Sequence, residues 1–174
     1  INKQLFIMRK LVLLIFFIFY SFEVIAGCDD PIGDGVDYTN CRFSDGQDLQ
    51  GSYLPNSNLS FASFIKVNFN KSIMMNSILA FGTFPESSFF RANLYEANLQ
   101  GANLEQSDFT SSNLTRANFQ GATLIGANFN NANLIEADLT SANIIDVNFE
   151  GANLNNTIWP DGRRCGIDSI GKCN

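Results

Sequence analysis

Large apolar side chains recur at every fifth position from Leu49 to Trp159. All 23 positions of this series carry Leu, Ile, Met, Phe or Trp. The residue two positions earlier is Ala, Ser, Gly, Val or Thr in 22 of the 23 cases, and Gln47 is the exception. A period of five fits neither the 3.6-residue repeat of a helix nor the two-residue repeat of a strand. The chain must therefore turn a corner every few residues, which predicts a solenoid that stacks on itself.

The apolar residue of each pentapeptide is called the centre here, and its neighbours are numbered −2, −1, +1 and +2 along the chain. Every fourth centre reveals a second period, of twenty residues. One column of centres is Leu49, Phe69, Phe89, Phe109, Phe129 and Phe149, and the next is Leu54, Met74, Leu94, Leu114, Leu134 and Leu154. Aromatic and aliphatic side chains thus occupy separate columns. This sorting predicts four sides per coil, with like side chains stacked on like.

The repeat is clearest between Ala92 and Asn156, which reads ANLYE ANLQG ANLEQ SDFTS SNLTR ANFQG ATLIG ANFNN ANLIE ADLTS ANIID VNFEG ANLNN. These residues resemble the pentapeptide-repeat family, whose unit is A(D/N)LXX. The resemblance implies an all-β fold, a right-handed quadrilateral β-helix in which the centre and the small −2 residue point inward. We assign residues 49–159 to this β-helix. The chain slips register once before it, because Phe43 and Leu49 are six residues apart.

Four cysteines flank the repeats, and none lies within them. Cys28 and Cys41 precede the repeats, and Cys165 and Cys173 follow them. An even number of Cys in local pairs on an exported chain indicates two disulfides, which would staple an N-terminal cap over residues 27–48 and a C-terminal cap over residues 160–174. A zinc site is the alternative, but these spacings lack the C-x-x-C geometry that zinc sites favour. No metal or cofactor is expected.

The N-terminus has the pattern of a targeting segment. Met8, Arg9 and Lys10 precede the apolar run LVLLIFFIFYSF, as in a signal peptide. We predict a signal peptide over residues 1–26, or over 8–26 with an upstream extension, and hence export to the periplasm or beyond the cell. Cleavage before Gly27 is one interpretation. The other is a bacterial lipobox ending at Cys28, which would give a membrane-tethered lipoprotein, and retention of the segment would give an anchor.

The charge balance is acidic. The chain carries 11 Lys and Arg against 17 Asp and Glu, a net charge of −6, and no His. Removing residues 1–26 leaves 8 basic against 16 acidic residues, or −8. Such a chain should repel nucleic acid, whose phosphates are bound by Lys and Arg. The acidic residues of the repeats lie at outward positions, so we interpret them as solvated groups and predict no enzyme.

One apolar set stands out at outward positions. Phe61 and Phe81 both lie two residues after a centre and are twenty residues apart, so they should stack on one outer edge. A contiguous exposed apolar patch marks an interaction surface. We predict that the patch contacts a partner protein or a second copy of the chain. The predicted patch comprises Phe61, Ile65, Met75, Phe81 and Phe90, and Ile125 and Ile145 form a smaller pair on a second face.

The sequence favours a non-enzymatic, exported scaffold that binds another protein and is a monomer or a side-by-side homodimer. The resemblance also implies an alternative, because some members of the family mimic DNA and bind a topoisomerase in the cytoplasm. An export signal and paired cysteines argue against that role. The two hypotheses differ in a simple observable, since the scaffold should be exported without free thiols and the DNA mimic should be cytoplasmic and reduced.

Overall fold

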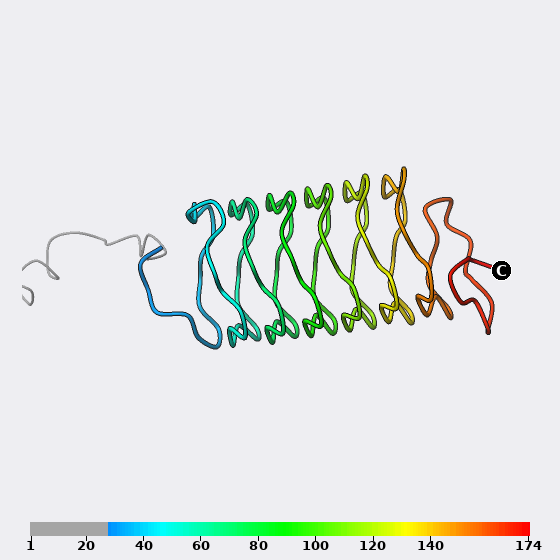
Figure 1. The fold of residues 1–174 in the computed structure, drawn as a ribbon, viewed down its shortest axis with the longest axis horizontal. Helices are drawn as coiled ribbons and strands as arrows, with labels where there is room; N and C mark the ends of the chain where they lie inside the picture. Colours follow the sequence, from blue (N-terminus) through cyan, green and yellow to red (C-terminus); the bar gives the residue numbers. More distant parts are fainter. Residues whose placement is uncertain (1–27) are drawn as a thin grey trace, which may run out of the picture.

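The computed structural model describes residues 28–174, so the predicted signal peptide lies outside the described residues. These residues form one stack of similar coils with the C-terminus at one end (Figure 1). Neighbouring coils pair in parallel through single bridging positions, all of them −1 residues, and residues 28–174 contain no longer strand. From the bridge of Asp48 with Asn68 to that of Asp138 with Ile158, the partners are twenty residues apart. The prediction of four pentapeptides per coil is thus confirmed, and the right-handed sense stays a prediction.

The register slip lies between Phe43 and Leu49, as the sequence predicted. Asp37 pairs with Asn58 and Arg42 pairs with Ser63, which are separations of 21 residues instead of 20. One extra residue is therefore accommodated before Asp48. Tyr38 and Phe43 are buried like the centres of later coils. The bridges between coils thus begin at residue 37, inside the segment that the sequence assigns to the N-terminal cap, and the N–H of Gly35 already donates to the carbonyl of Pro55 at 2.9 Å.

The core is a column of inward side chains that runs the length of the stack. The rings of Phe69, Phe89, Phe109, Phe129 and Phe149 lie one above another, with centroids 4.8 to 5.4 Å apart and planes within 18° of parallel. The small −2 residues are buried beside them, most of them Ala or Ser. At the C-terminal end the ring of Trp159 packs on that of Phe149, with a centroid distance of 5.2 Å.

Six of the seven serines at −2 positions donate their hydroxyl to a backbone carbonyl, and Ser72, whose buried hydroxyl makes no hydrogen bond within the described chain, is the exception. The hydroxyl of Ser77 donates to the carbonyl of Met74 at 2.6 Å, and that of Ser112 donates to Phe109 at 2.7 Å. A buried hydroxyl without such a bond would cost about 1–3 kcal/mol. Serine can therefore replace Ala inside the solenoid without interrupting the repeat.

The corners of each coil lie at the +2 position. Every non-glycine +2 residue from Asn56 to Asn156 has a positive φ, between 54° and 60°. This left-handed conformation costs most L-residues about 1–2 kcal/mol, and Gly and Asn least. The −1 asparagines have a different role, because their side chains bond to nearby backbone. For example, Oδ1 of Asn98 accepts the N–H of Gln100 at 3.0 Å.

Both predicted disulfides are present. Cys28 is bonded to Cys41, and Cys165 to Cys173. At the C-terminal end the chain reverses direction, so that Ile170 pairs antiparallel with Asn153 and Arg164 pairs antiparallel with Ile158. The segment 160–174 therefore folds back over the last coil (Figure 1).

Candidate interaction surface

Phe61 and Phe81 lie on one corner of the solenoid, one coil apart. Their side chains are 57% and 51% exposed, and their rings stack at a centroid distance of 5.3 Å with planes 13° apart. The ring of Phe81 also covers Gly101, the next residue of the same corner, so closely that an added Cβ would lie 2.6 Å from it. The pair therefore forms a fixed aromatic ridge that points to solvent.

The other three residues of the predicted patch are less exposed. Ile65, Met75 and Phe90 are all half-buried at +1 positions. The guanidinium of Arg91 lies 5.0 Å from the centre of the Phe90 ring and covers part of it. On the second face, Ile145 is 59% exposed, whereas Ile125 is half-buried. The exposed apolar surface thus centres on Phe61 and Phe81.

Within residues 49–159, three exposed apolar residues escaped the sequence analysis. Tyr53, Ile73 and Ile78 are 53%, 36% and 41% exposed, and all occupy −1 positions. In the next coils these columns carry asparagine at 93, 98, 113 and 118. Asn or Asp at −1 normally accepts the N–H of the +1 residue, as Asn93 accepts that of Tyr95 at 3.3 Å. The missed signal is therefore the replacement of this asparagine by Tyr or Ile in the N-terminal coils.

Tyr53, Phe61, Ile73, Ile78 and Phe81 are named the lateral surface. Tyr53 and Ile73 bridge between adjacent coils, and Ile78 and Phe81 follow on the next side and its corner. Folding does not require these side chains, because asparagine or glycine occupies the same positions in later coils. A phenylalanine in the left-handed corner is in fact the less favourable choice for stability. The lateral surface is thus an exposed apolar area that the fold itself does not use.

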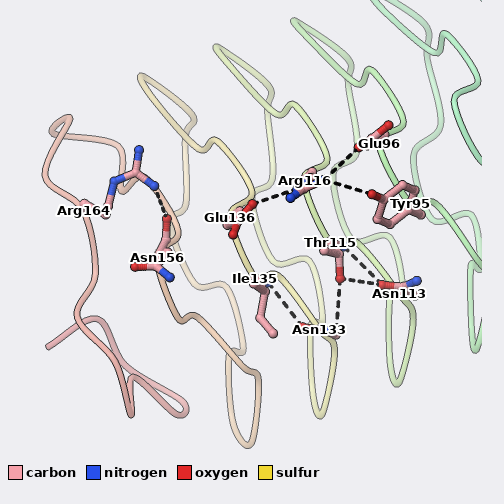
Figure 2. Close-up of polar contacts among 10 residues, drawn as sticks. All are labelled: Tyr95, Glu96, Asn113, Thr115, Arg116, Asn133, Ile135, Glu136, Asn156 and Arg164. Atoms are coloured by element: carbon pink, nitrogen blue, oxygen red, sulfur yellow. Dashed lines mark hydrogen bonds and ion pairs between the residues drawn. The ribbon is translucent and has the colours of Figure 1, made fainter.

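The acidic corner groups make ion pairs between coils. Arg116 lies between Glu96 and Glu136, at 3.3 and 2.7 Å, and also donates to the hydroxyl of Tyr95 (Figure 2). These contacts, first of all the bond to Glu136, raise the pKa of the Arg116 guanidinium. On another corner, Lys66 pairs with Glu86 at 3.1 Å. Exposed pairs of this kind contribute little to stability.

The carboxylates at −1 positions also have structural partners. Oδ1 of Asp138 accepts the backbone N–H of Thr140 at 2.8 Å and is also bonded to its hydroxyl, and Gln120 donates to Oδ2. Burial raises the pKa of Asp138, but the bonds from Thr140 and Gln120 outweigh it and hold the pKa below its usual value. Asp108 makes the same two contacts with Thr110. These carboxylates therefore close turns in the same way as the −1 asparagines.

Residues 28–174 contain neither a metal-binding cluster nor a candidate membrane-spanning helix. No group of three or more His, Cys, Asp or Glu residues in this range could hold a metal ion. The same residues include no apolar helix of membrane-spanning length.

The repeat profile described as "Pentapeptide repeats" matches residues 48–79, 87–124 and 117–156, in 8 copies. Together the matched segments cover more than half of the chain. The chain belongs to the pentapeptide-repeat family. The resemblance stated from the sequence is thereby confirmed, and the parallel coils and inward centres agree with it.

Several solved structures are similar to this pentapeptide-repeat chain. QnrB1, a plasmid-mediated fluoroquinolone resistance protein, is 18% identical with a TM-score of 0.48 over 71% of this chain and 72% of that one. Rfr23 from the cyanobacterium Cyanothece 51142 is 24% identical, with a TM-score of 0.37 over 72% of this chain and 89% of its own. A pentapeptide repeat protein from the Arabidopsis thaliana thylakoid lumen is 27% identical, with a TM-score of 0.35 over 69% of each chain. No curated protein matches the sequence.

Replacing both Phe61 and Phe81 by Asn should leave the free energy of unfolding within about 1 kcal/mol of wild type. The variant loses a stacked aromatic pair worth about 0.5–1.5 kcal/mol. It also relieves two left-handed phenylalanines, and Asn already occupies this corner conformation at positions 56, 76, 131 and 156. Chemical denaturation measures the difference. A loss of 3 kcal/mol or more, roughly that of a core deletion, would mean that the ridge is structural.

Proposed function

We propose that this protein is a non-enzymatic, exported scaffold that binds a partner protein through the lateral surface. The observation that carries the proposal is the cluster of exposed apolar side chains at positions where later coils carry asparagine or glycine. An exposed apolar cluster on an otherwise polar surface is typical of protein interaction sites. The continuous inter-coil hydrogen bonding makes the solenoid a rigid support for that cluster.

The partner should contact the aromatic ridge directly. A photo-crosslinking residue at Ile78, on the side of the coil that ends at the Phe81 corner, should give a specific adduct in the exported fraction, and the adduct should disappear in the Phe61→Asn, Phe81→Asn variant. Buried aromatic anchors supply most of the binding energy in such interfaces, so their loss should weaken binding at least about tenfold. Position 118 is the matched control, because Asn118 occupies the same −1 column as Ile78 two coils away from it.

Two outcomes would contradict this proposal. An adduct of equal yield at position 118 would mean that the contact is not specific to the lateral surface. An adduct at position 78 that survives the double Asn substitution would mean that the ridge contributes nothing to binding. The stability measurement described above separates both outcomes from a loss of fold.

Export is the second half of the proposal. Disulfides form in oxidising compartments, and the sulfur of Cys28 is bonded to Cys41, whereas lipidation would need the same sulfur. We therefore expect a mature chain that begins at Gly27. Intact mass should reveal four alkylated cysteines only after reduction. An acyl mass on Cys28 would indicate a membrane-tethered lipoprotein, and an uncleaved chain with four free thiols would contradict export.

Mimicry of DNA is the alternative, and the charge distribution does not favour it. A DNA mimic needs continuous rows of unpaired negative charge. On one corner Arg116 interrupts the acidic row between Glu96 and Glu136. On another, Lys66 precedes Glu86, and the next corner residues, Gln106 and Gly126, are neutral.

A further inference from the structure

The two ends of a solenoid expose backbone groups that would pair with a further coil. At the C-terminal end, the segment 160–174 satisfies these groups on two sides of the last coil. The N–H groups of Leu154, Asn156 and Trp159 donate to its carbonyls at 2.8, 3.1 and 2.8 Å. The carbonyl of Ala152 accepts from Gly171 at 2.9 Å. These two sides therefore end in a paired, antiparallel cover.

The other two sides of the last coil have no such cover among the described residues. One coil earlier, the N–H groups of Leu124, Gly126 and Phe129 donate to the next coil at 2.7 to 2.9 Å. The equivalent N–H groups of Ile144, Asp146 and Phe149 have no acceptor within residues 28–174. The carbonyls of Ala142 and Val147 likewise receive no bond there, whereas those of Ala122 and Ala127 do. Residues 142–150, named the open edge, thus present five unpaired backbone groups on two adjoining sides.

The side chains of the open edge are apolar and acidic. Ile145 is 59% exposed, and Ile144 and Val147 are half-buried. Asp146 and Glu150 are exposed, and neither forms an ion pair with a cation of the described chain. The edge contains no Lys or Arg. Its chemistry therefore suits an extended peptide with apolar and basic side chains.

We propose that the open edge binds an extended, basic segment of a partner protein by adding it as a β-strand. The molecule already contains this mode of pairing, because its own segment 164–170 lies antiparallel across the two neighbouring sides. Main-chain bonds to Ile144, Asp146 and Phe149 would supply affinity, and Lys or Arg side chains would meet Asp146 and Glu150. This kind of strand addition is a common mode of peptide recognition.

A second copy of the chain fits the open edge less well. Pairing two open edges would bring Asp146 and Glu150 of one copy against the same carboxylates of the other, with no basic residue between them in either edge. Like charges that face each other across a strand pair destabilise it. The net charge of −8 on residues 27–174 adds long-range repulsion. Charge therefore selects a basic partner over self-association.

The test uses a defined probe, the peptide KVKVGVKVK, in which the central Gly permits the turn at Asp146. Its matched control is EVEVGVEVE. In amide NMR spectra of the disulfide-intact protein, the lysine peptide should give saturable shifts centred on Ile144, Asp146 and Phe149. The glutamate peptide should give none at the same concentration. Equal binding of both peptides, or no saturation by the lysine peptide, would overturn the proposal.

Variants of the open edge sharpen the test. Ile144→Pro removes an N–H that makes no bond within the described chain, and Ile144→Val is its control. Loss of that one hydrogen bond should weaken binding of the lysine peptide about three- to tenfold. Asp146→Lys should weaken it about two- to fivefold, and its left-handed corner already accepts lysine at positions 66 and 71. Undiminished binding by Asp146→Lys would contradict the proposal even if the Pro variant failed to fold.

Two further outcomes would indicate another occupant of the open edge or another binding site for the peptide. Shifts of the edge amides with protein concentration alone would indicate a second copy as the occupant. Shifts confined to the lateral surface would indicate that the peptide binds there. The inference extends the proposed scaffold function but can fail separately, because the Phe61→Asn, Phe81→Asn variant should bind the peptide normally. Binding of a second copy at the open edge, or binding of the peptide at the lateral surface alone, would overturn the strand-addition proposal.

Discussion

Phe109→Ala is expected to lower the free energy of unfolding by about 3–5 kcal/mol, the usual range for a buried phenylalanine. The ring is fully buried and is stacked between Phe89 and Phe129 at 4.8 and 4.9 Å. Phe119 also meets its edge at 6.0 Å. The coils are hydrogen-bonded on both sides of the cavity, so they cannot collapse into it. Denaturant unfolding measures the loss.

Phe109→Leu is the matched control for this core deletion. Leucine occupies many other centres, including Leu94, Leu99 and Leu104, so the lumen accepts its shape. The loss should be less than about 1.5 kcal/mol, because most of the volume is kept. Equal losses for Ala and Leu would mean that ring stacking, and not filled volume, dominates the core.

Removing the C-terminal disulfide by Cys165→Ser and Cys173→Ser is expected to cost about 2–3 kcal/mol, the chain-entropy value for a short loop. The two cysteines are eight residues apart, and Cys165 is buried. The N–H of Asn156 donates to the carbonyl of Cys165, so the cover over the last coil depends on this segment. We therefore expect the loss to begin at the C-terminal end.

Hydrogen exchange would locate that loss. The amides of Leu154, Asn156 and Trp159 should exchange faster without the disulfide, whereas the amides of Phe89 and Leu94 should keep their protection. Each coil of a solenoid contacts only its neighbours, so damage at one end need not reach the middle. Removal of Cys28 and Cys41 should have the complementary effect at the N-terminal end. Uniform loss of protection along the chain would contradict local fraying.

The sequence predicted those features of the fold that depend on position within the repeat. The periods of five and twenty assign each residue to a side, and the bridges and buried centres agree with that assignment. The left-handed corner at +2 was not predicted, because residues as different as Gly, Lys, Glu and Phe occupy it. The choice of residue there reflects the outer surface more than the backbone.

The candidate surfaces were less predictable for two physical reasons. Side-chain exposure depends on the residues of adjacent coils, so Phe90 is partly covered by Arg91 while Phe81 projects into solvent. The path of residues 160–174 follows no repeat, so nothing in the pattern of the chain predicts that it covers two sides of the last coil and leaves the others open. The backbone hydrogen bonds of Leu154 and Trp159, and their absence at Ile144, distinguish these sides.

The extra residue before Asp48 has a consequence for how the chain can change length. It lies in a coil that pairs with another described coil on one side only, whereas one inserted residue in the middle would have to be accommodated between coils that pair on both sides. A duplication of twenty residues, such as 92–111, would instead add a complete coil and lengthen the solenoid by about 4.8 Å, the spacing between paired strands. The distance between the lateral surface and the open edge can therefore vary only in whole steps. The number of complete twenty-residue coils thus sets the spacing between these two surfaces.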